Sequence, residues 1–274
     1  MEYRGKNGEY FELVTINQSN CDILKSSGNN QLSLLWFTSD LNYLSIDLVP
    51  YTFNKNKIIC VTEFHMIEIE KIHELKLLRF NKPFYCILDH DSEVGCKGIL
   101  YYGSPSLPLI DIIDSDIEIL ESVWKVLLIE MKSQDSLQLE MLQMMLKRIL
   151  ILCTRIYKTQ NNFQSLDKAY VNIVREFNFL VERHFKEFHI VVEYANLLNK
   201  APKTLSNLFK KLGNKTPLQF IQNRLLIEAI RLLKYSDKSI SDIGYELGFS
   251  DVQSFSRFFK KQKGFSPNEY RLSA

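Results

Sequence analysis

The chain has 274 residues, of which 46% are hydrophobic, so it can form two domains of ordinary size, each with an apolar core. No apolar run reaches the ~18 residues that span a bilayer. The residues that follow Met1 also lack the shorter apolar run of a signal peptide, so we expect neither a membrane segment nor a secretory signal. The five cysteines are odd in number and lack Cys-x-x-Cys spacing, which favours reduced thiols in a cytosolic protein and argues against a redox or metal role.

The small net charge of +2 conceals an uneven distribution along the chain. From Ser165 to the end, 18 Lys and Arg residues oppose 11 Asp and Glu residues, a net charge of +7, whereas the preceding part has a net charge of −5. A basic C-terminal part beside an acidic N-terminal part indicates that one of the two domains meets a polyanion.

Residues 10–100 contain short apolar runs with a period close to two, separated by clusters of Asn, Gly, Pro and Asp. The runs begin at Leu32, Leu44, Lys57, Met66, Leu75 and Phe84. Several short strands at this spacing predict a β-barrel or a β-sandwich. The mouth of a barrel suits a small ligand. The aromatic residues that could line it, although an ordinary core or surface position is favoured for each, are Trp36, Tyr43, Tyr85 and Tyr101.

A loop at residues 100–109 precedes two predicted helices, at residues 116–131 and from Ser136 to about Lys158. The second helix has apolar residues close to a seven-residue repeat. These residues are Leu142, Met145, Ile149, Leu152 and Ile156. Leu139, Leu146 and Cys153 widen the stripe, and a wide stripe suits either a dimer contact or packing on the strands of the same chain.

A polar stretch from Thr159 to Lys168 breaks the helical period. We therefore predict a linker at residues 161–168. A helix with an apolar face follows, from about Ala169 to Lys186.

Residues 240–271 predict two short helices around a tight turn, followed by the start of a third. Ser239 and Asp242 have the spacing of a capping box, so the first helix begins there. Gly248 ends this helix, because a residue with positive φ is most favourable when it is glycine.

The second of these helices begins after another predicted capping box, formed by Ser250 and Gln253. It has an apolar face and a polar, basic face. The apolar face consists of Phe255, Phe258 and Phe259. Two short helices, a turn glycine and a basic second helix together predict a helix-turn-helix unit.

The same pattern occurs 50 residues earlier in the chain. Leu205-Ser-Asn-Leu-Phe-Lys-Lys aligns with Phe255-Ser-Arg-Phe-Phe-Lys-Lys, and the alignment continues to Thr216-Pro217 against Ser266-Pro267. Upstream the offset is 49, so that Asn199 aligns with Gly248. The repeat predicts two helix-turn-helix units, joined by a helix from Pro217 to about Leu233.

Five segments of the second unit form a long, ungapped motif. They are Ile243-Gly244, Gly248-Phe249, Ser254–Lys260, Gly264–Pro267 and Tyr270-Arg271. This motif resembles the signature of the AraC/XylS family of bacterial transcription regulators. Gly244 stands where the family has alanine, which lowers helix propensity but keeps the residue small.

The resemblance covers roughly the last hundred residues closely and the rest by architecture. It implies an α+β fold, with a cupin-like β-barrel and two helices at residues 1–160 and an all-α DNA-binding domain with two helix-turn-helix units at residues 169–274. It also implies a homodimer through the long helix that precedes the linker. Metal-binding cupins have a His-x-His pair, but His65, His73 and His90 are separate here, so we expect no metal and no cofactor.

A recognition helix places its early residues at base edges in the major groove. Arg pairs with guanine, Asn and Gln pair with adenine, and apolar groups contact the thymine methyl. The outward residues of the two recognition helices, which also match the base-contacting positions of the family, are Lys203, Thr204, Ser206, Asn207, Val252, Gln253, Ser256 and Arg257. Candidates for phosphate contacts, each equally suited to a solvated surface, are Lys210, Lys211, Lys215, Lys260, Lys261 and Lys263.

The function that these features predict is a sequence-specific DNA-binding transcription regulator in the bacterial cytoplasm, with an activator favoured over a repressor. Its expected partners are double-stranded DNA and a second copy of the chain, with RNA polymerase and an unidentified small-molecule effector as further candidates. Two alternatives stay open. The N-terminal domain could serve dimerisation alone, without an effector, or it could be a cupin-type metalloenzyme, which requires clustered His and Glu ligands.

Overall fold

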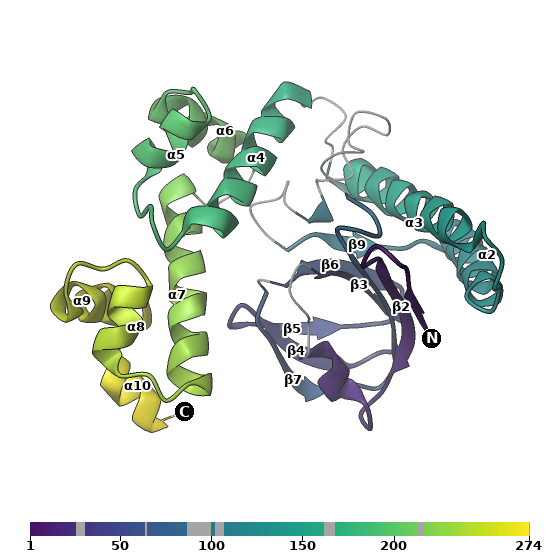
Figure 1. Ribbon diagram of the computed structural model, residues 1–274, viewed down its shortest axis with the longest axis horizontal. Helices are drawn as coiled ribbons and strands as arrows, with labels where there is room; N and C mark the ends of the chain where they lie inside the picture. The colour runs from purple at the N-terminus through teal and green to yellow at the C-terminus, as the bar shows by residue number, and fades with distance from the viewer. Residues whose placement is uncertain are drawn as a thin grey trace. The chain divides into compact units, whose positions relative to one another are not determined.

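The computed structural model describes residues 1–25, 31–63, 65–86, 100–101, 107–161, 168–212 and 216–273, with the side chains of residues 168–171, 212 and 273 left undescribed. The chain divides into two compact units, Met1–Val171 and Asn172–Ala274 (Figure 1). Residues 162–167 of the predicted linker lie outside the described part.

The first unit contains two β-sheets. One has six strands in the order β1-β2-β8-β3-β6-β9, and the other has three in the order β5-β4-β7. The strands are β1 Glu2–Arg4, β2 Tyr10–Ile16, β3 Gln31–Phe37, β4 Asn42–Ile46, β5 Val49–Phe53, β6 Lys57–Thr62, β7 Ile67–Lys71, β8 Leu75–Asn81 and β9 Leu109–Asp111. All the pairs within each sheet are antiparallel.

The predicted N-terminal β-sheet domain is confirmed, but its strands do not form a closed barrel in the part of the unit that the structure describes. A barrel closes only when its edge strands pair with each other. Here the edges of the larger sheet are β1 and β9, of three residues each, and neither pairs with a strand of the smaller sheet. The two sheets instead face each other, as in the sandwich that the strand pattern equally allowed.

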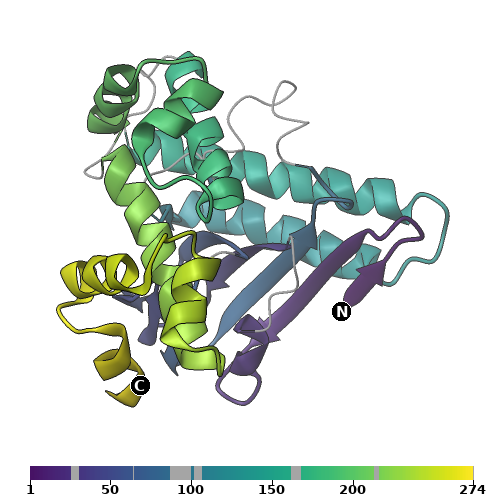
Figure 2. The ribbon, with the colours of Figure 1, turned by 60° about the vertical axis from the view of Figure 1, so that its left-hand side comes forward.

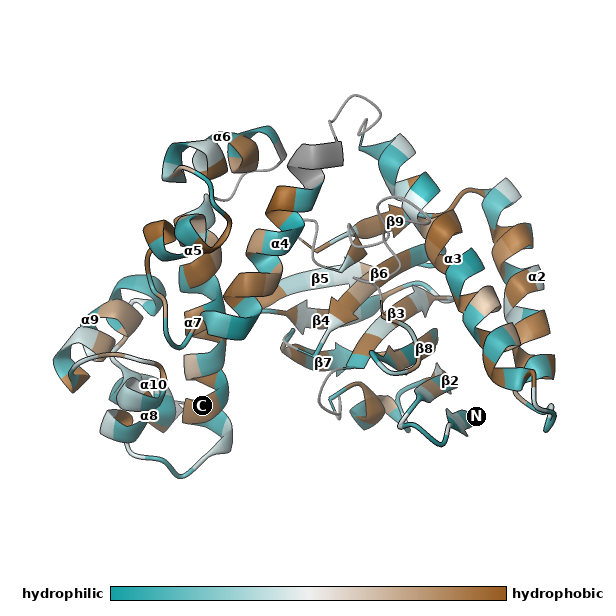
Figure 3. Ribbon diagram, turned by 45° about the horizontal axis from the view of Figure 1, so that its top comes forward, coloured by the Kyte–Doolittle hydropathy of each residue, from teal (hydrophilic) through white to brown (hydrophobic). Residues whose placement is uncertain are grey.

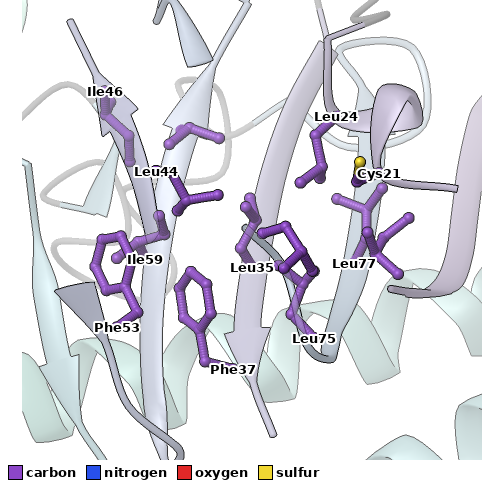
Figure 4. Close-up of a cluster of buried hydrophobic side chains, with 13 residues drawn as sticks. Cys21, Leu24, Leu35, Phe37, Leu44, Ile46, Phe53, Ile59, Leu75 and Leu77 are labelled. Carbon is purple, nitrogen blue, oxygen red and sulfur yellow. The ribbon is translucent and has the colours of Figure 1, made fainter. Parts of the chain in front are cut away.

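A shared apolar core lies between the two sheets (Figure 4). Leu35 and Phe37 of β3 contribute to it from the larger sheet, and Leu44 and Phe53 contribute from the smaller one. The rings of Phe37 and Phe53 stack at 4.3 Å between centroids, with an interplanar angle of 9°. Because such offset aromatic pairs add stability to the apolar area that they bury, this contact helps to hold the two sheets together.

The second face of the larger sheet is covered by two helices, α2 (Asp114–Glu130) and α3 (Gln138–Gln160), which lie side by side (Figure 2). Trp36 of β3 meets Trp124 of α2 edge to face, at 6.2 Å between ring centroids. The Lys76 ammonium lies 4.2 Å from the Trp36 ring centroid and 2.6 Å from a carboxylate oxygen of Glu121. Since both faces of the sheet are covered, β3, β6 and β8 are buried along almost their whole length.

One predicted strand is wrong in its described part. Residues 84–86 form a turn and an irregular segment, and the rest of that run lies outside the described residues. The Phe84 ring instead stacks on Phe11 at 4.7 Å. The short strand β9 was not predicted, since three residues are too few for a period-two pattern to be detected.

The second unit is helical. Its helices are α4 Lys168–His184, α5 Val191–Leu197, α6 Pro202–Leu212, α7 Pro217–Tyr235, α8 Ile240–Glu246, α9 Val252–Lys263 and α10 Pro267–Ser273. Hydrophobic and hydrophilic residues alternate along α4, α6, α7 and α9, as expected of helices with one buried face (Figure 3). None of the helices in the described ranges has the length and apolar character needed to cross a membrane.

Candidate nucleic-acid interface

The first helix-turn-helix unit consists of α5 and α6 and will be called head 1. The turn between them contains Asn199 with a φ of 51°, a left-handed conformation that asparagine tolerates better than most residues. Leu205 and Phe209 of α6 are fully buried, and Phe209 meets Phe177 of α4 edge to face at 5.0 Å. The apolar side of α6 is therefore fixed against the unit, and its polar side faces outward.

The second helix-turn-helix unit, head 2, consists of α8 and α9. Its predicted first cap is confirmed, because Asp242 N–H donates to Ser239 Oγ at 3.1 Å and the Asp242 carboxylate accepts from Ser239 N–H at 3.3 Å. Gly248 has a φ of 81°, as predicted for the residue that ends this helix. Phe255 and Phe259 of α9 are fully buried.

The start of α9 differs from the prediction by one residue. Its N-cap is Asp251, whose carboxylate accepts from the Ser254 N–H at 2.6 Å, so the predicted pair of Ser250 and Gln253 is wrong. Asp, Asn and Ser are all good caps, and the spacing alone did not distinguish two adjacent candidates. As a result, the exposed Gln253 is not used by the cap, and its amide faces solvent.

The internal repeat is confirmed by the structure. Asn199 and Gly248, paired by the alignment, both have positive φ. The paired residues Leu205 and Phe255 are both fully buried. The helix that joins the heads, α7, is capped by Thr216, whose hydroxyl accepts from the Gln219 N–H at 3.2 Å, as the sequence predicts.

The predicted base-contacting residues all lie on the outer sides of α6 and α9 or at their first turns. Exposed positions are Lys203, Thr204, Ser206, Asn207, Gln253 and Arg257, whereas Val252 and Ser256 are half-buried. Ser206 donates its hydroxyl proton to Pro202 C=O in its own helix at 3.1 Å. Arg257 Nη2 donates to Ser254 Oγ at 3.2 Å, and the side chain has four further N–H donors.

The predicted phosphate contacts lie near the C-terminal ends of the same helices. Lys210, Lys211, Lys260 and Lys261 are exposed, Lys263 is half-buried, and Lys215 lies outside the described residues. Lysines in a last helical turn also interact favourably with the helix dipole, so their position has a structural reason besides any phosphate.

A buried ionic network joins α4 to α7 and was not predicted. Arg224 Nε donates to Glu182 at 2.6 Å, and its Nη1 donates to Glu228 at 3.1 Å. The guanidinium also lies 4.0 Å from the centroid of the Phe185 ring. The signal was present in the sequence as an Arg and a Glu four residues apart beside the apolar stripe of α7.

The first unit has a polar cavity of about 470 Å³ at one end of the six-stranded sheet. Arg79 is only 4% exposed there, and it donates to Ser33 Oγ at 3.2 Å, to Glu12 at 3.3 Å and to Ile23 C=O at 2.9 Å. Burial, followed by the neighbouring charge of Glu12, raises the pKa of Tyr10 to about 12. The other residues that line this cavity are Arg4, Gly5, Gly8, Glu9, Gln31 and Asn81.

Aromatic residues considered as barrel lining lie elsewhere. Trp36, Tyr85 and Tyr101 are buried in the core, at 3%, 5% and 6% exposure, and none of them lines this cavity. Glu12 and Arg79 were not distinguished in the sequence, because only the register of β2 against β8 brings them together.

The five residues predicted for dimerisation do not share one environment. Leu142 and Ile149 are 0% and 3% exposed inside the first unit, so they offer no surface to a second copy. Met145, Leu152 and Ile156 are half-buried. Exposed apolar residues at the start of this helix were not predicted, namely Leu137 at 64%, Met141 at 37% and Met144 at 59%.

Residues 194–273 match a protein family described as a helix-turn-helix domain. The chain is 33% identical to HTH-type transcriptional activator RhaS of Enterobacter sp. strain 638 over 91 residues. These 91 residues make up 33% of this chain and 33% of RhaS. The chain thus matches about a third of the length of such curated relatives.

Two solved structures are also similar. The C-terminal domain of AraT, a response regulator from Geobacillus stearothermophilus, is 28% identical, and the likeness covers 37% of this chain and 85% of that domain, with a TM-score of 0.35. ToxT from Vibrio cholerae is 17% identical, with coverage of 96% of this chain and 98% of ToxT and a TM-score of 0.45.

Proposed function

We propose, on the premise that the chain belongs to the AraC/XylS family through its C-terminal helix-turn-helix domain, that the whole protein is a sequence-specific DNA-binding transcription regulator. The observation that supports this function best is the pair of equivalent heads in one unit. Each head places polar residues at the start of a second helix whose apolar side is buried, which is the geometry of a helix that enters the major groove.

The length of α7 suits this role. At about 1.5 Å per residue, its 19 residues span roughly 28 Å. One turn of DNA measures about 34 Å, so two heads near the ends of such a helix suit successive major grooves on one side of the duplex. The basic character of residues 165–274 supplies the attraction to phosphates that this mode of binding requires.

Activation of transcription is the direction that we favour, because the curated relatives are named as activators. An activator acts on RNA polymerase, which is then a further partner. The N-terminal unit serves regulation or assembly in this proposal.

A homodimer through the exposed side of α3 is part of this proposal. Leu137, Met141 and Met144 form an apolar stripe there, and Met145 and Leu152 lie beside it. Leaving such residues in water is unfavourable, and a second copy of the same helix would cover them. The opposite side of α3, with Leu142 and Ile149, holds the helix on its own sheet.

A small-molecule effector stays part of this proposal beside a unit that serves dimerisation alone, and the polar cavity beside Arg79 is its candidate site. A cavity of about 470 Å³ lies within the range of ordinary ligand sites. A thermal-shift screen of the full chain against a metabolite panel tests this part. The control is Arg79→Met, which retains the aliphatic stem but removes the donors, and a ligand that stabilises both proteins equally binds elsewhere.

The main function is tested with the full chain and a random-sequence DNA library. Repeated selection and sequencing should yield one motif with two parts, one for each head. A footprint on the selected DNA should then protect both parts. Recovery of sequences with no common motif would contradict the proposed function.

A further inference from the structure

The loop that precedes head 1 contacts the turn of head 2. This loop, residues 185–190, connects α4 to α5. His189 Nε2 donates to the Leu247 C=O at 2.9 Å, and the His189 ring lies 4.9 Å from the Phe249 ring. In addition, Lys186 Nζ lies 3.0 Å from a carboxylate oxygen of Glu246. Residues about 60 positions apart in the chain therefore join the heads at a place other than α7.

Gly248 shows how close this contact is. A Cβ atom added to Gly248 would lie 1.9 Å from the Lys186 carbonyl oxygen, far inside van der Waals contact. The equivalent position in head 1 is Asn199, which adopts the same left-handed region with a side chain present. Left-handed backbone alone thus does not require glycine in this repeat. What requires glycine in head 2 is the approach of the loop that precedes head 1.

Glu246 connects the contact to the rest of head 2. Its second carboxylate oxygen accepts from Lys238 Nζ at 2.6 Å, and Lys238 directly precedes the capped start of α8. Hydrogen bonds from Lys238 and then from Lys186 lower the pKa of the Glu246 carboxyl, so it is ionised at neutral pH. The Glu246 carboxylate of head 2 therefore accepts from a lysine of the loop that precedes head 1 and from a lysine that lies just before α8.

Both heads already pack on α7, and a second attachment away from the axis of this helix further restrains rotation of one head relative to the other. Successive base pairs of DNA differ by roughly 35° of rotation, because one turn contains 10–10.5 base pairs. A protein whose heads cannot rotate relative to each other therefore fits one spacing of half-sites and misfits a spacing that differs by one base pair.

We propose that Lys186, His189, Glu246 and Gly248 form an inter-head clamp that fixes the relative orientation of the two heads and thereby sets the spacing of the DNA half-sites that the protein accepts. This inference rests on the proposed function. The four residues are positioning residues, because they act through the recognition helices and are distinct from the predicted base-contacting set.

The test compares two double variants of the full chain. The clamp variant, Lys186→Ala with His189→Ala, removes the side chains that cross between the heads. The control variant, Lys238→Ala with His184→Ala, also removes one lysine bound to Glu246 and one histidine, but its contacts stay local. Lys238 lies next to α8, and His184 Nδ1 is 2.9 Å from Glu187 three residues away.

The first measurement needs no DNA. Unnatural amino acids with a ketone group replace Lys210 and Lys260, which are exposed and occupy equivalent positions in the two heads. Spin labels attached to the ketones leave the native cysteines unlabelled. Pulsed electron paramagnetic resonance then measures the distance between the two labels. A narrow distance distribution is expected for the parent and control proteins, and a broader one for the clamp variant. Equal widths in all three proteins would overturn the clamp.

The second measurement uses the selected DNA with one base pair inserted or deleted between the two half-sites. The parent and the control should lose affinity for both altered spacings, and the loss should be about tenfold smaller for the clamp variant. If the distances broaden but the clamp variant still discriminates spacings like the parent, the spacing claim is wrong. A further outcome is that the parent protein selects no common DNA motif while the distance distribution of the clamp variant broadens as expected. In that case the proposed function is wrong, and the claim about half-site spacing is wrong with it.

Discussion

Arg224 Nε donates to the Glu182 carboxylate at 2.6 Å, and the two side chains are only 7% and 14% exposed. This bond joins α7, which connects the heads, to α4, the first helix of the unit. Removing one partner of a buried ion pair leaves an uncompensated charge, so a substitution here should cost more than a substitution in an exposed pair.

We expect Arg224→Ala to lower the free energy of unfolding of the second unit by about 3–5 kcal/mol. The matched control is Arg231→Ala, which also removes an arginine that donates to Glu228, but whose side chain is 59% exposed. That change should cost at most about 1 kcal/mol. Urea unfolding of the full chain, followed by circular dichroism, measures both. The two tryptophans, Trp36 and Trp124, lie in the first unit, so their fluorescence should show an unchanged transition in both variants.

Arg257→Ala should lower affinity for the selected DNA by about 1–3 kcal/mol and relax the preference at one or two base pairs. Lys261→Ala removes the same charge from the same helix, but should weaken binding to all sequences about equally and lower the salt slope by about 1. Titrations against selected and scrambled DNA at several salt concentrations measure the contrast. Equal losses on both kinds of DNA for Arg257→Ala would remove Arg257 from the base-contacting set.

The two sides of α3 should respond differently to a charge. Ile149→Lys places an ammonium where the side chain is 3% exposed, and should destabilise the first unit by about 3 kcal/mol or more. Met144→Lys changes a residue that is 59% exposed, and should leave the unit folded while weakening the dimer. Tryptophan fluorescence on unfolding and analytical ultracentrifugation separate the two effects. A folded Met144→Lys protein that stays dimeric at the lowest concentrations measured would place the interface elsewhere.

The cap of α9 should make head 2 sensitive to acid. A hydrogen bond from the Ser254 backbone N–H, followed by one from its hydroxyl, lowers the pKa of Asp251 below the ordinary value of 3.8. Since the folded pKa is the lower one, the stabilisation from the charged cap is complete above the unfolded pKa and is lost as the pH falls through the folded one.

Asp251→Asn tests this pH dependence, because asparagine caps a helix without titrating. The parent should have the higher Tm at neutral pH, and the difference should shrink as the pH falls below about 4. Asp237→Asn, which removes an exposed carboxylate two residues before the Ser239 cap, is the control and should show no such convergence. A difference in Tm between parent and Asp251→Asn that does not vary with pH would show that the cap is not the titrating group.

Local patterns were enough to predict the second unit, because its helices are specified by nearby residues. The capping boxes at Ser239 and Thr216, the left-handed turn residues and the buried faces of α6 and α9 all follow from spacings of a few positions. The internal repeat reinforced these signals, since two copies of one pattern predict one structure twice. The outward residues of the recognition helices followed directly from the same periodicity.

Tertiary structure alone decided the features that depend on residues far apart in the chain. The separation of the strands into two sheets depends on which edges pair, and short strands do not specify their partners. The wide stripe of α3 suited two kinds of packing, and the presence of the sheet beneath it decided which side is buried. The contact of His189 with Leu247 arises because two heads 49 or 50 residues apart in the chain pack on one helix. Such a contact produces no periodic pattern in the sequence, and its one trace there is the glycine at position 248.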